Sequence, residues 1–361
     1  SNEYSQFKKV LKKLTNVFEV SDLLKTVLSD ENSKKKLIST ICKNEDVENI
    51  YDDLLEKSPD RLATELIEGV PIAKNSNLTN FLSESRYQLQ PLHNFFFTRD
   101  ASISINEKVI IGKLANKVRE REAIIMEAIF NCTNIFETET INPSINTKIE
   151  NITIEGGDIL IARHDIILVG TGARTTTHGI DYLIEKFKEL KRDMNIIVQV
   201  LPKAPESFIH LDMVFTLLDN DKCLVYPPVI FNQHAFETVH ISIKNGKVQK
   251  ITEQKNLLAA LSKLGMKIDP INCGGNKDEW TQEREQWHSG ANFFAVGPGR
   301  ILGYSRNEYT IEEINKNGFE VLKAKDIISN KVKLEKYNKY LITIEGAELA
   351  RGGGGCRCMT M

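Results

Sequence analysis

The first part of the chain carries apolar residues at helical spacing. Phe7, Val10 and Leu14 recur at intervals of three and four, which is the period of one face of an α-helix. Ser21 or Asp22 is expected to be the N-cap of a second helix, because each is a preferred capping residue just before an apolar run. Further amphipathic runs follow at residues 37–42, 47–55 and 61–67. We therefore predict a mostly helical block over residues 1–85.

After this block the apolar residues gather into short runs that are typical of β-strands. These runs lie at residues 109–111, 152–154, 159–162, 166–169, 196–201, 213–218, 223–225, 293–296, 301–304 and 340–344. Helical spacing returns between them, at residues 117–129, 179–190 and 257–264. Strand pairs that alternate with single helices predict an α/β fold of small sheets around a common axis, with the helices outside. We assign residues 86–361 to this domain.

A doubly wound parallel sheet is the alternative fold. Such a sheet commonly carries Gly-x-Gly-x-x-Gly after its first strand, and no such stretch follows a predicted strand here. Many of the predicted strands also follow one another through tight turns, which parallel strands cannot use. Both observations favour the repeated small sheets.

Composition and charge limit the class of partner. The 47 basic and 49 acidic residues leave a net charge of -2, so no global field attracts nucleic acid or an anionic membrane. No run of about 18 apolar residues is present to span a bilayer. These observations predict a small-molecule partner, and they leave a homo-oligomer open.

Six cysteines are scattered through the 361 residues. In a long chain this distribution predicts reduced thiols, and therefore a cytoplasmic protein, better than it predicts a disulfide framework. The chain does not begin with methionine, so we expect its native N-terminus to be missing.

Two stretches place charged residues beside apolar neighbours. In Asn94–Asp100 (NFFFTRD), the phenylalanines predict burial, and Arg99 beside Asp100 is explained equally well by a local ion pair. In Ile154–Ile161 (IEGGDILI), the glycine pair is explained either by an ordinary turn or by a backbone that approaches a ligand, with Glu155 and Asp158 turned inward.

A third stretch, His210–Thr216 (HLDMVFT), alternates polar and apolar residues. In a strand His210 and Asp212 would lie on one face and Leu211 and Met213 on the other. A lone histidine on a strand is usually structural, whereas a histidine beside a carboxylate is a candidate general acid and base.

The acidic residues of these stretches would repel one another in a shared dry pocket unless a cation lies among them. A zinc ion is one candidate, although the terminal cysteines Cys356 and Cys358 are spaced C-x-C and not C-x₂-C. A guanidinium group fits better, because its fixed N–H pairs match carboxylates bidentately. A thiolate below its central carbon would then face a polarised electrophile.

Taken together, these stretches and the last residues resemble the arginine deiminase family, which belongs to the amidinotransferase superfamily. The matching motifs, in family order, are residues 94–100, Glu155–Asp158, His210–Thr216 and Arg357–Met361, and Arg284–Trp287 with Gly290–Asn292 is a further stretch that the family carries. The resemblance implies a five-bladed α/β propeller of ββαβ units, with a helical insertion that matches the first block. The opening strand of the family is not visible before Tyr4.

The resemblance also implies a role for particular residues. Cys358 would be the nucleophile and His210 the general acid and base, while Asp100 and Asp212 would hold the guanidinium nitrogens and Glu155 would orient His210. The residues implied at the rest of the substrate are Asn94, Arg119, Asp158 and Arg174.

The implied reaction is hydrolysis of L-arginine to citrulline and ammonia through a cysteine S-alkylthiouronium, with no metal or organic cofactor. A free thiol titrates near ~8.5, so the cationic substrate, His210 and loop amides would help form the thiolate.

The terminal loop departs from the family pattern, because Gly353 and Cys356 stand where the family has arginine and proline. Losing a charge-assisted contact weakens binding by ~1.5–3 kcal/mol, which leaves the substrate open. The alternatives are an arginine dihydrolase, an amidinotransferase, and a non-catalytic propeller that binds a partner. Loss of the cysteine, histidine or carboxylates would indicate the last of these, and none is lost.

Overall fold

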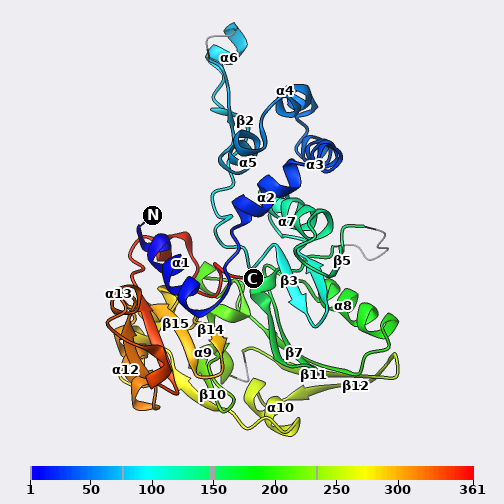
Figure 1. Ribbon diagram of the computed structural model, residues 1–361. Coiled ribbons are helices and arrows are strands. Elements are labelled where there is room, and N and C mark those ends of the chain that lie inside the picture. Colours follow the sequence, from blue (N-terminus) through cyan, green and yellow to red (C-terminus); the bar gives the residue numbers. More distant parts are fainter. Residues whose placement is uncertain (1, 75–76, 146–150, 233–234) are drawn as a thin grey trace. The chain divides into compact units, whose positions relative to one another are not determined.

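The computed structural model describes residues 2–74, 77–145, 151–232 and 235–361 (Figure 1). The chain divides into two compact units: Ser1–Val17 with Pro143–Met361 form unit 1, and Phe18–Asn142 form unit 2. The division into a helical block 1–85 and a catalytic domain 86–361 stays a prediction.

Helices dominate unit 2. Their bounds are α2 (Val20–Leu28), α3 (Glu31–Asn44), α4 (Tyr51–Leu55), α5 (Pro59–Glu68), α6 (Leu78–Leu82) and α7 (Glu120–Cys132). The apolar stripes of α2, α3, α5 and α7 meet in one cluster, in which Leu24, Ile38, Leu62 and Ile129 are completely buried. The short strands β1 (Val70–Pro71) and β2 (Tyr87–Leu89) pair in an antiparallel manner.

The predicted cap of the second helix is wrong. The N-cap of α2 is Glu19, whose carbonyl oxygen accepts hydrogen bonds from the backbone N–H groups of Asp22 and Leu23, both at 3.0 Å. Ser21 and Asp22 therefore lie inside the first turn. Asp22 still favours the helix there, because an acidic side chain in the first turn opposes the helix dipole.

A unit of two antiparallel strands, a helix and a strand parallel to the second recurs four times in the described residues. In unit 2 it comprises β3 (Ser102–Ile105), β4 (Lys108–Ile111), α7 and β5 (Glu139–Ile141). In unit 1 it comprises β6 (Ile159–Arg163), β7 (Ile166–Thr171), α8 (Thr177–Glu189) and β8 (Met194–Val200); β9 (Phe215–Leu217), β10 (Lys222–Val225), α10 (Leu257–Lys263) and β13 (Asp269–Asn272); and β14 (Phe294–Gly297), β15 (Arg300–Tyr304), α12 (Glu308–Lys316) and β17 (Tyr340–Ile344). The predicted mixed α/β class of small sheets is confirmed.

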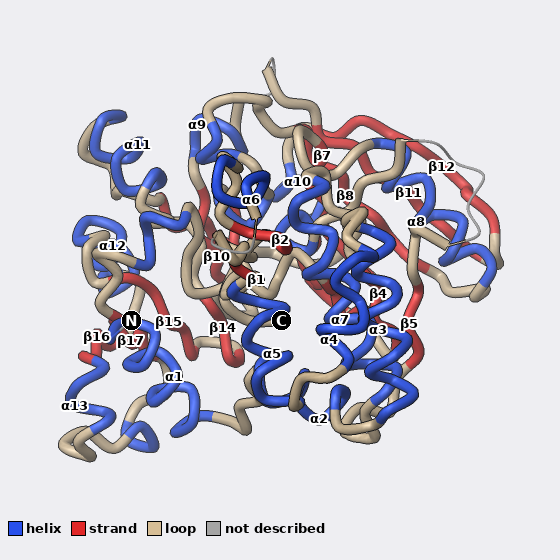
Figure 2. The backbone as a smooth tube through the Cα atoms, turned by 90° about the horizontal axis from the view of Figure 1, so that it is seen from above, coloured by secondary structure: helices blue, strands red, loops and turns tan. Residues whose placement is uncertain are grey.

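Additional strands extend two of these sheets. The hairpin of β11 (Thr238–Lys244) and β12 (Lys247–Gln254) adds to the edge of β8, and these strands run side by side with β7 in Figure 2. Its turn has positive φ at Asn245 (50°) and Gly246 (69°), which is the backbone that a tight two-residue hairpin turn requires. β16 (Glu320–Lys323) pairs with β17 in parallel.

The run predicted as a strand at 152–154 is not one. Only Ile154 forms a bridge there, although Ile152 and Ile154 are fully buried. Burial of a loop produces the same apolar run as a strand, and the run alone cannot distinguish the two. The predicted strand 213–218 likewise begins later, at Phe215.

The N-terminal helix α1 (Asn2–Leu14) holds the segment that leads to the terminal loop. The Glu3 carboxylate accepts hydrogen bonds from the backbone N–H groups of Ala347, Glu348 and Leu349 at 2.9–3.2 Å. The remaining helices of unit 1 are α9 (Pro227–Ile230), α11 (Glu279–Trp287) and α13 (Ala324–Ile328). Among the described residues, no helix combines the length and apolarity needed to cross a bilayer.

A buried carboxylate of α11 caps α12. Glu285, which is 1% exposed, accepts hydrogen bonds from Tyr309 N–H (2.9 Å), Thr310 N–H (2.8 Å) and the Thr310 hydroxyl (2.7 Å). The first N–H groups of a helix have no partner within it, so this carboxylate satisfies two of them.

We expect Glu285→Ala to lower the free energy of unfolding by about 2–4 kcal/mol, because it leaves buried donors without partners. The measurement is urea unfolding followed by circular dichroism. Glu283→Ala, which changes an exposed glutamate of the same helix, is the control and should stay within about 0.5 kcal/mol of the wild type. Equal effects of the two substitutions would contradict the capping role.

Candidate active site

Glu155 precedes a short 3₁₀ turn, Gly156–Asp158, that ends at Asp158 and leads into β6. Both carboxylates are completely buried in unit 1. Glu155 N–H donates to the Thr175 hydroxyl at 3.1 Å, and Asp158 Oδ1 accepts a hydrogen bond from Leu211 N–H at 2.9 Å. These bonds fix the Glu155 backbone to the segment after β7 and the Asp158 carboxylate to the loop that carries His210.

Burial raises the pKa of Asp158 from its usual 3.8 to about 7. The charge of His210 and hydrogen bonds from Thr175 and Leu211 oppose this rise, and Glu155 adds to it. A glycine is needed beside this carboxyl, since a Cβ at Gly170 would lie 2.3 Å from Asp158 Oδ1.

This raised pKa predicts how stability depends on pH. Between about pH 4 and pH 7 the native Asp158 holds a proton that the unfolded chain has lost, so the contribution of Asp158 to stability is fully present below that window and is lost as pH rises through it. Asp158→Asn should reduce this loss, because its amide oxygen still accepts from Leu211 N–H without titrating. The measurement is the melting temperature at about pH 5 and about pH 8. An equal pH dependence in wild type and variant would contradict the raised pKa.

His210 and Asp212 do not alternate on a strand, which corrects the sequence prediction. His210 has extended dihedrals and precedes a 3₁₀ turn, Leu211–Met213, that contains Asp212. Three alternating residues are too few to distinguish a strand from a turn, and the strand β9 begins only at Phe215. Both side chains are nevertheless buried. His210 contacts Glu155, and Asp212 contacts Arg357.

The His210 ring faces Glu155. His210 Nε2 lies 2.8 Å from Glu155 Oε2, and the Arg174 guanidinium lies 3.7 Å from the other oxygen of this carboxylate. A carboxylate at hydrogen-bond distance fixes the orientation of the ring and stabilises positive charge on it. This pair can therefore deliver and recover a proton.

The terminal loop is packed against unit 1. It follows a 3₁₀ turn, Leu349–Gly352, and turns at Gly353, where φ is 83°. Tyr304 Oη donates to Gly354 O at 3.1 Å, and a Cβ at Gly355 would lie 2.6 Å from Asn292 O. Glycine at 355 thus permits close approach of the loop to its neighbour.

Cys358 lies at the Asp212 carboxylate. Its Sγ is 3.8 Å from Asp212 Oδ2, and Arg357 Nη1 donates to the same oxygen at 2.6 Å. Arg357 Nη2 also donates to Ile159 O at 2.8 Å. At this distance Asp212 Oδ2 can accept a weak hydrogen bond from the Cys358 thiol.

Cys356 lies in different surroundings. It is completely buried, and burial raises the pKa of its thiol far above the usual range. A buried thiol of this kind remains protonated and is a poor nucleophile. No disulfide joins any of the cysteines in the described residues.

The other predicted site residues lie in unit 2. Arg119, at the start of α7, donates to Asp100 Oδ2 at 2.9 Å and binds the Glu122 carboxylate through Nε (3.0 Å) and Nη2 (2.8 Å). Asp100 is buried, whereas Asn94 is exposed in a turn before the buried Phe95. Asp100 therefore forms an ion pair with Arg119. From the sequence, only a local ion pair between Asp100 and Arg99 was expected.

Two residues at this site had no role in the sequence analysis. Arg357 was noted only as a neighbour of Cys358, and Asn292 only as part of a motif. The side chain of Asn292 contacts Asp212 O at 3.1 Å and Cys358 N at 3.2 Å. The stretch Gly290–Asn292 was the available signal in the sequence, but it did not indicate that Asn292 contacts Asp212 and Cys358.

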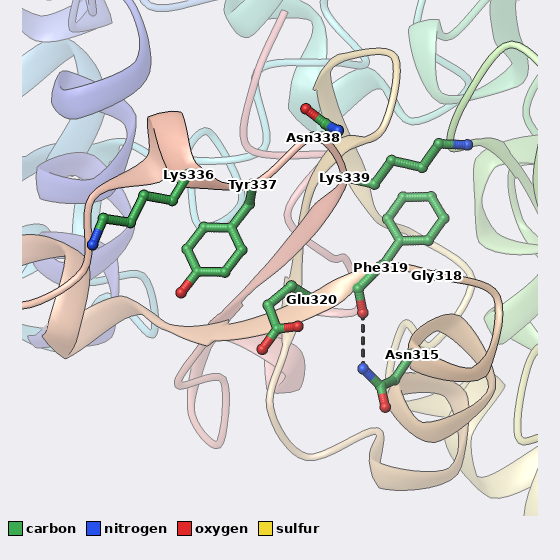
Figure 3. Close-up of a pocket in the computed structure, with 8 residues that line it drawn as sticks. All are labelled: Asn315, Gly318, Phe319, Glu320, Lys336, Tyr337, Asn338 and Lys339. Carbon is green, nitrogen blue, oxygen red and sulfur yellow. Dashed lines mark hydrogen bonds between the residues drawn. The ribbon is translucent and has the colours of Figure 1, made fainter.

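A separate hollow of about 460 Å³ lies at the end of α12 and the start of β16, beside residues 336–339. Figure 3 shows the residues that line it. Its lining residues are Asn315, Gly318, Phe319, Glu320, Lys336, Tyr337, Asn338 and Lys339. None of the predicted site residues lines it. Most of these lining residues are exposed, so they do not enclose a polar binding site.

Comparison with known proteins gives a family match over the whole chain. The family model for arginine deiminase matches residues 1–361. The arginine deiminase of Borrelia garinii subsp. bavariensis is 30% identical over 380 residues, which cover 99% of this chain and 85% of that protein. The arginine deiminase of Listeria innocua is 30% identical over 351 residues, covering 94% and 80%.

Solved structures give weaker matches. The substrate-bound N-terminal domain of ArgZ, a cyanobacterial arginine dihydrolase, matches with a TM-score of 0.46 and 17% identity, covering 74% of this chain and 75% of that chain. A dimethylarginine dimethylaminohydrolase adduct matches with a TM-score of 0.45 and 18% identity, covering 74% and 77%.

Proposed function

The chain belongs to the arginine deiminase family, and on that premise we propose that it hydrolyses L-arginine to L-citrulline and ammonia, with Cys358 as the nucleophile. The observation that carries this proposal is the arrangement at Asp212. One oxygen of this buried carboxylate meets the Cys358 thiol, while Oδ1 is buried without a hydrogen-bond partner among the described residues. A buried carboxylate oxygen requires a donor, and a substrate guanidinium supplies one.

In this proposal each remaining predicted residue keeps its assigned role. Asp100 and Asp212 hold the guanidinium nitrogens, His210 is the general acid and base, and Glu155 orients it. The residues proposed to line the rest of the substrate site are Asn94, Arg119, Asp158 and Arg174.

The reaction proceeds in two halves. Cys358 Sγ forms a bond to the guanidinium carbon, the C–N bond breaks, and His210 protonates the departing ammonia. His210 then deprotonates a water molecule, whose oxygen adds to the same carbon as the S–C bond breaks. Citrulline leaves and the thiol is restored.

Substrate binding activates the nucleophile. In the resting site Cys358 is a thiol beside a carboxylate, and a thiolate there would be repelled by Asp212. A bound guanidinium reverses the local charge and favours the thiolate. The proton leaves Cys358 only when the electrophile is in place, and in this proposal His210 accepts it and passes it to the departing ammonia.

We further propose that the recurring ββαβ units are blades of a five-bladed propeller, as the family resemblance implies. The mixed parallel and antiparallel pairing of each unit supports this proposal. The cysteines, which form no disulfide in the described residues, support a reducing compartment such as the cytoplasm. We also propose that the chain forms a homo-oligomer. The measurement that tests this is its molecular mass in solution.

The test is incubation of the purified chain with L-arginine, agmatine or methylated arginines in separate reactions, followed by product analysis. We expect citrulline and ammonia in equal amounts from L-arginine and little product from the other compounds. Ornithine with one carbon dioxide and two ammonia molecules would indicate a dihydrolase instead. Product only after an acceptor amine is added would indicate an amidinotransferase.

A further inference from the structure

The Asn292 side chain connects two segments that are far apart in the sequence. Its Nδ2 donates to the carbonyl oxygen of Asp212 at 3.1 Å, and its Oδ1 accepts from the backbone N–H of Cys358 at 3.2 Å. Asn292 itself is 1% exposed. One amide group therefore contacts both the 3₁₀ turn that contains Asp212 (the carboxylate turn) and the terminal loop that carries Cys358 (the nucleophile loop).

The segment that carries Asn292 is itself fixed. Asn292 N–H donates to Ser289 O at 3.0 Å, and the neighbouring Ala291 O accepts from the Thr216 hydroxyl at 2.5 Å. Gly290 permits the turn, because a Cβ there would lie 2.5 Å from Glu285 O. The Asn292 amide thus has little freedom to move independently of the turn behind it.

A second contact to the same loop lies six residues earlier in the sequence. Gln286, at the end of α11, donates through Nε2 to Met213 O at 3.1 Å and to Ser207 O at 2.6 Å. The segment from Gln286 to Asn292 therefore holds the loop around Asp212 from both sides of that residue.

The nucleophile loop packs directly against Asn292. A Cβ at Gly355 would lie 2.6 Å from both Asn292 O and Asn292 Oδ1. The absence of a side chain at 355 brings the loop close enough for Cys358 N–H to reach Asn292. The loop and the asparagine are matched in shape as well as in hydrogen bonding.

We propose that Asn292 is a positioning residue that sets the separation between Cys358 Sγ and the Asp212 carboxylate. It acts through the backbone of both residues and touches neither reacting atom. The inference rests on the proposed function only for its effect on turnover, since the geometry that it explains is present without substrate. Asparagine suits this place because its amide both donates and accepts, whereas alanine and serine lack that reach.

The experiment compares two small alkylating agents, 2-chloroacetamidine and 2-chloroacetamide. Both form a bond from carbon to sulfur and release chloride, but only the amidine is cationic. Their rate ratio at Cys358 reports how close the thiol is held to Asp212, because loop opening alone changes access for both agents. Trypsin cuts after Arg351 and Arg357, so Cys356 and Cys358 fall in the separate peptides 352–357 and 358–361 for mass spectrometry.

We expect the wild type to prefer the amidine, and Asn292→Ala and Asn292→Ser to lower the rate ratio and kcat/KM for L-arginine by about tenfold or more. Asn195→Ala is the control, because the half-buried Asn195 contacts His240 Nε2 at 2.9 Å, and both residues lie outside residues 207–216, 286–292 and 352–358. It should lower the melting temperature but leave the ratio within about twofold of the wild type.

Two results would overturn the proposal. One is a wild-type ratio near unity, and the other is a ratio in both Asn292 variants that matches the wild type. If Asn292→Ala does not fold, the smaller polar replacement Asn292→Ser decides. Should the wild type produce no citrulline, the proposed function fails while the alkylation ratio still tests the positioning role.

Discussion

Cys358→Ser is expected to abolish citrulline formation, with a loss of roughly 10⁴-fold or more in kcat. A serine hydroxyl is a far weaker nucleophile than a thiolate, and the neighbouring Asp212 carboxylate opposes its ionisation. The fold should be unchanged, because the two side chains differ by one atom. The measurement is citrulline production over time, with circular dichroism as the check on folding.

The matched control for this substitution is Cys356→Ala. Cys356 is buried in the same loop, and its raised pKa keeps the thiol protonated. The control variant should therefore retain turnover even if its stability falls by about 1 kcal/mol. Robust turnover by Cys358→Ser would exclude Cys358 as the nucleophile. Complete loss in a folded Cys356→Ala would contradict the idle role assigned to Cys356.

His210→Gln is expected to lower kcat by about 10²–10⁴-fold, the range typical of a lost general acid and base. Glutamine retains a polar group that can reach Glu155, which lies 2.8 Å from the imidazole, but it cannot transfer a proton. Both halves of the reaction should slow, since His210 protonates ammonia in the first and deprotonates water in the second.

His240→Gln provides the comparison. His240 is a half-buried histidine of β11 whose Nε2 lies 2.9 Å from Asn195 Oδ1, and it has no proposed part in the reaction. Its substitution should leave kcat within about twofold of the wild type. If the two variants lose activity equally, proton transfer is not the function of His210.

Much of the fold follows from local patterns. The amphipathic runs predict α3, α5, α7 and α8, because an apolar stripe at helical spacing must be buried. The hairpins and their crossover helices likewise follow from short apolar runs and tight turns. The patterns could not locate the start of α2, because Glu19, Ser21 and Asp22 all supply a polar side chain near its first turn.

The residue types of the site were predictable, but their contacts were not. His210 and Asp212 were expected on a strand, and the structure places them at a 3₁₀ turn. The partners of Asp212 lie far away in the sequence, with Arg357 separated from it by 145 residues and Asn292 by 80. Contacts over such separations depend on the packing of whole sheets, which no local pattern contains.

The glycines of the terminal loop illustrate the same limit. From the sequence, four consecutive glycines from Gly352 to Gly355 suggest a mobile loop that delivers Cys358. In the structure Gly354 and Gly355 are buried, and Gly355 touches Asn292. A glycine that permits close packing and a glycine that permits motion cannot be distinguished until the neighbour is known.

The covalent intermediate is the most direct test of the account. The wild type is mixed with L-arginine, quenched in acid during turnover, and digested with trypsin for mass spectrometry. We predict an adduct of arginine minus ammonia on the peptide 358–361, with none on the peptide 352–357 that contains Cys356. Citrulline formation without an adduct on Cys358, or with the adduct on Cys356, would contradict the central claim.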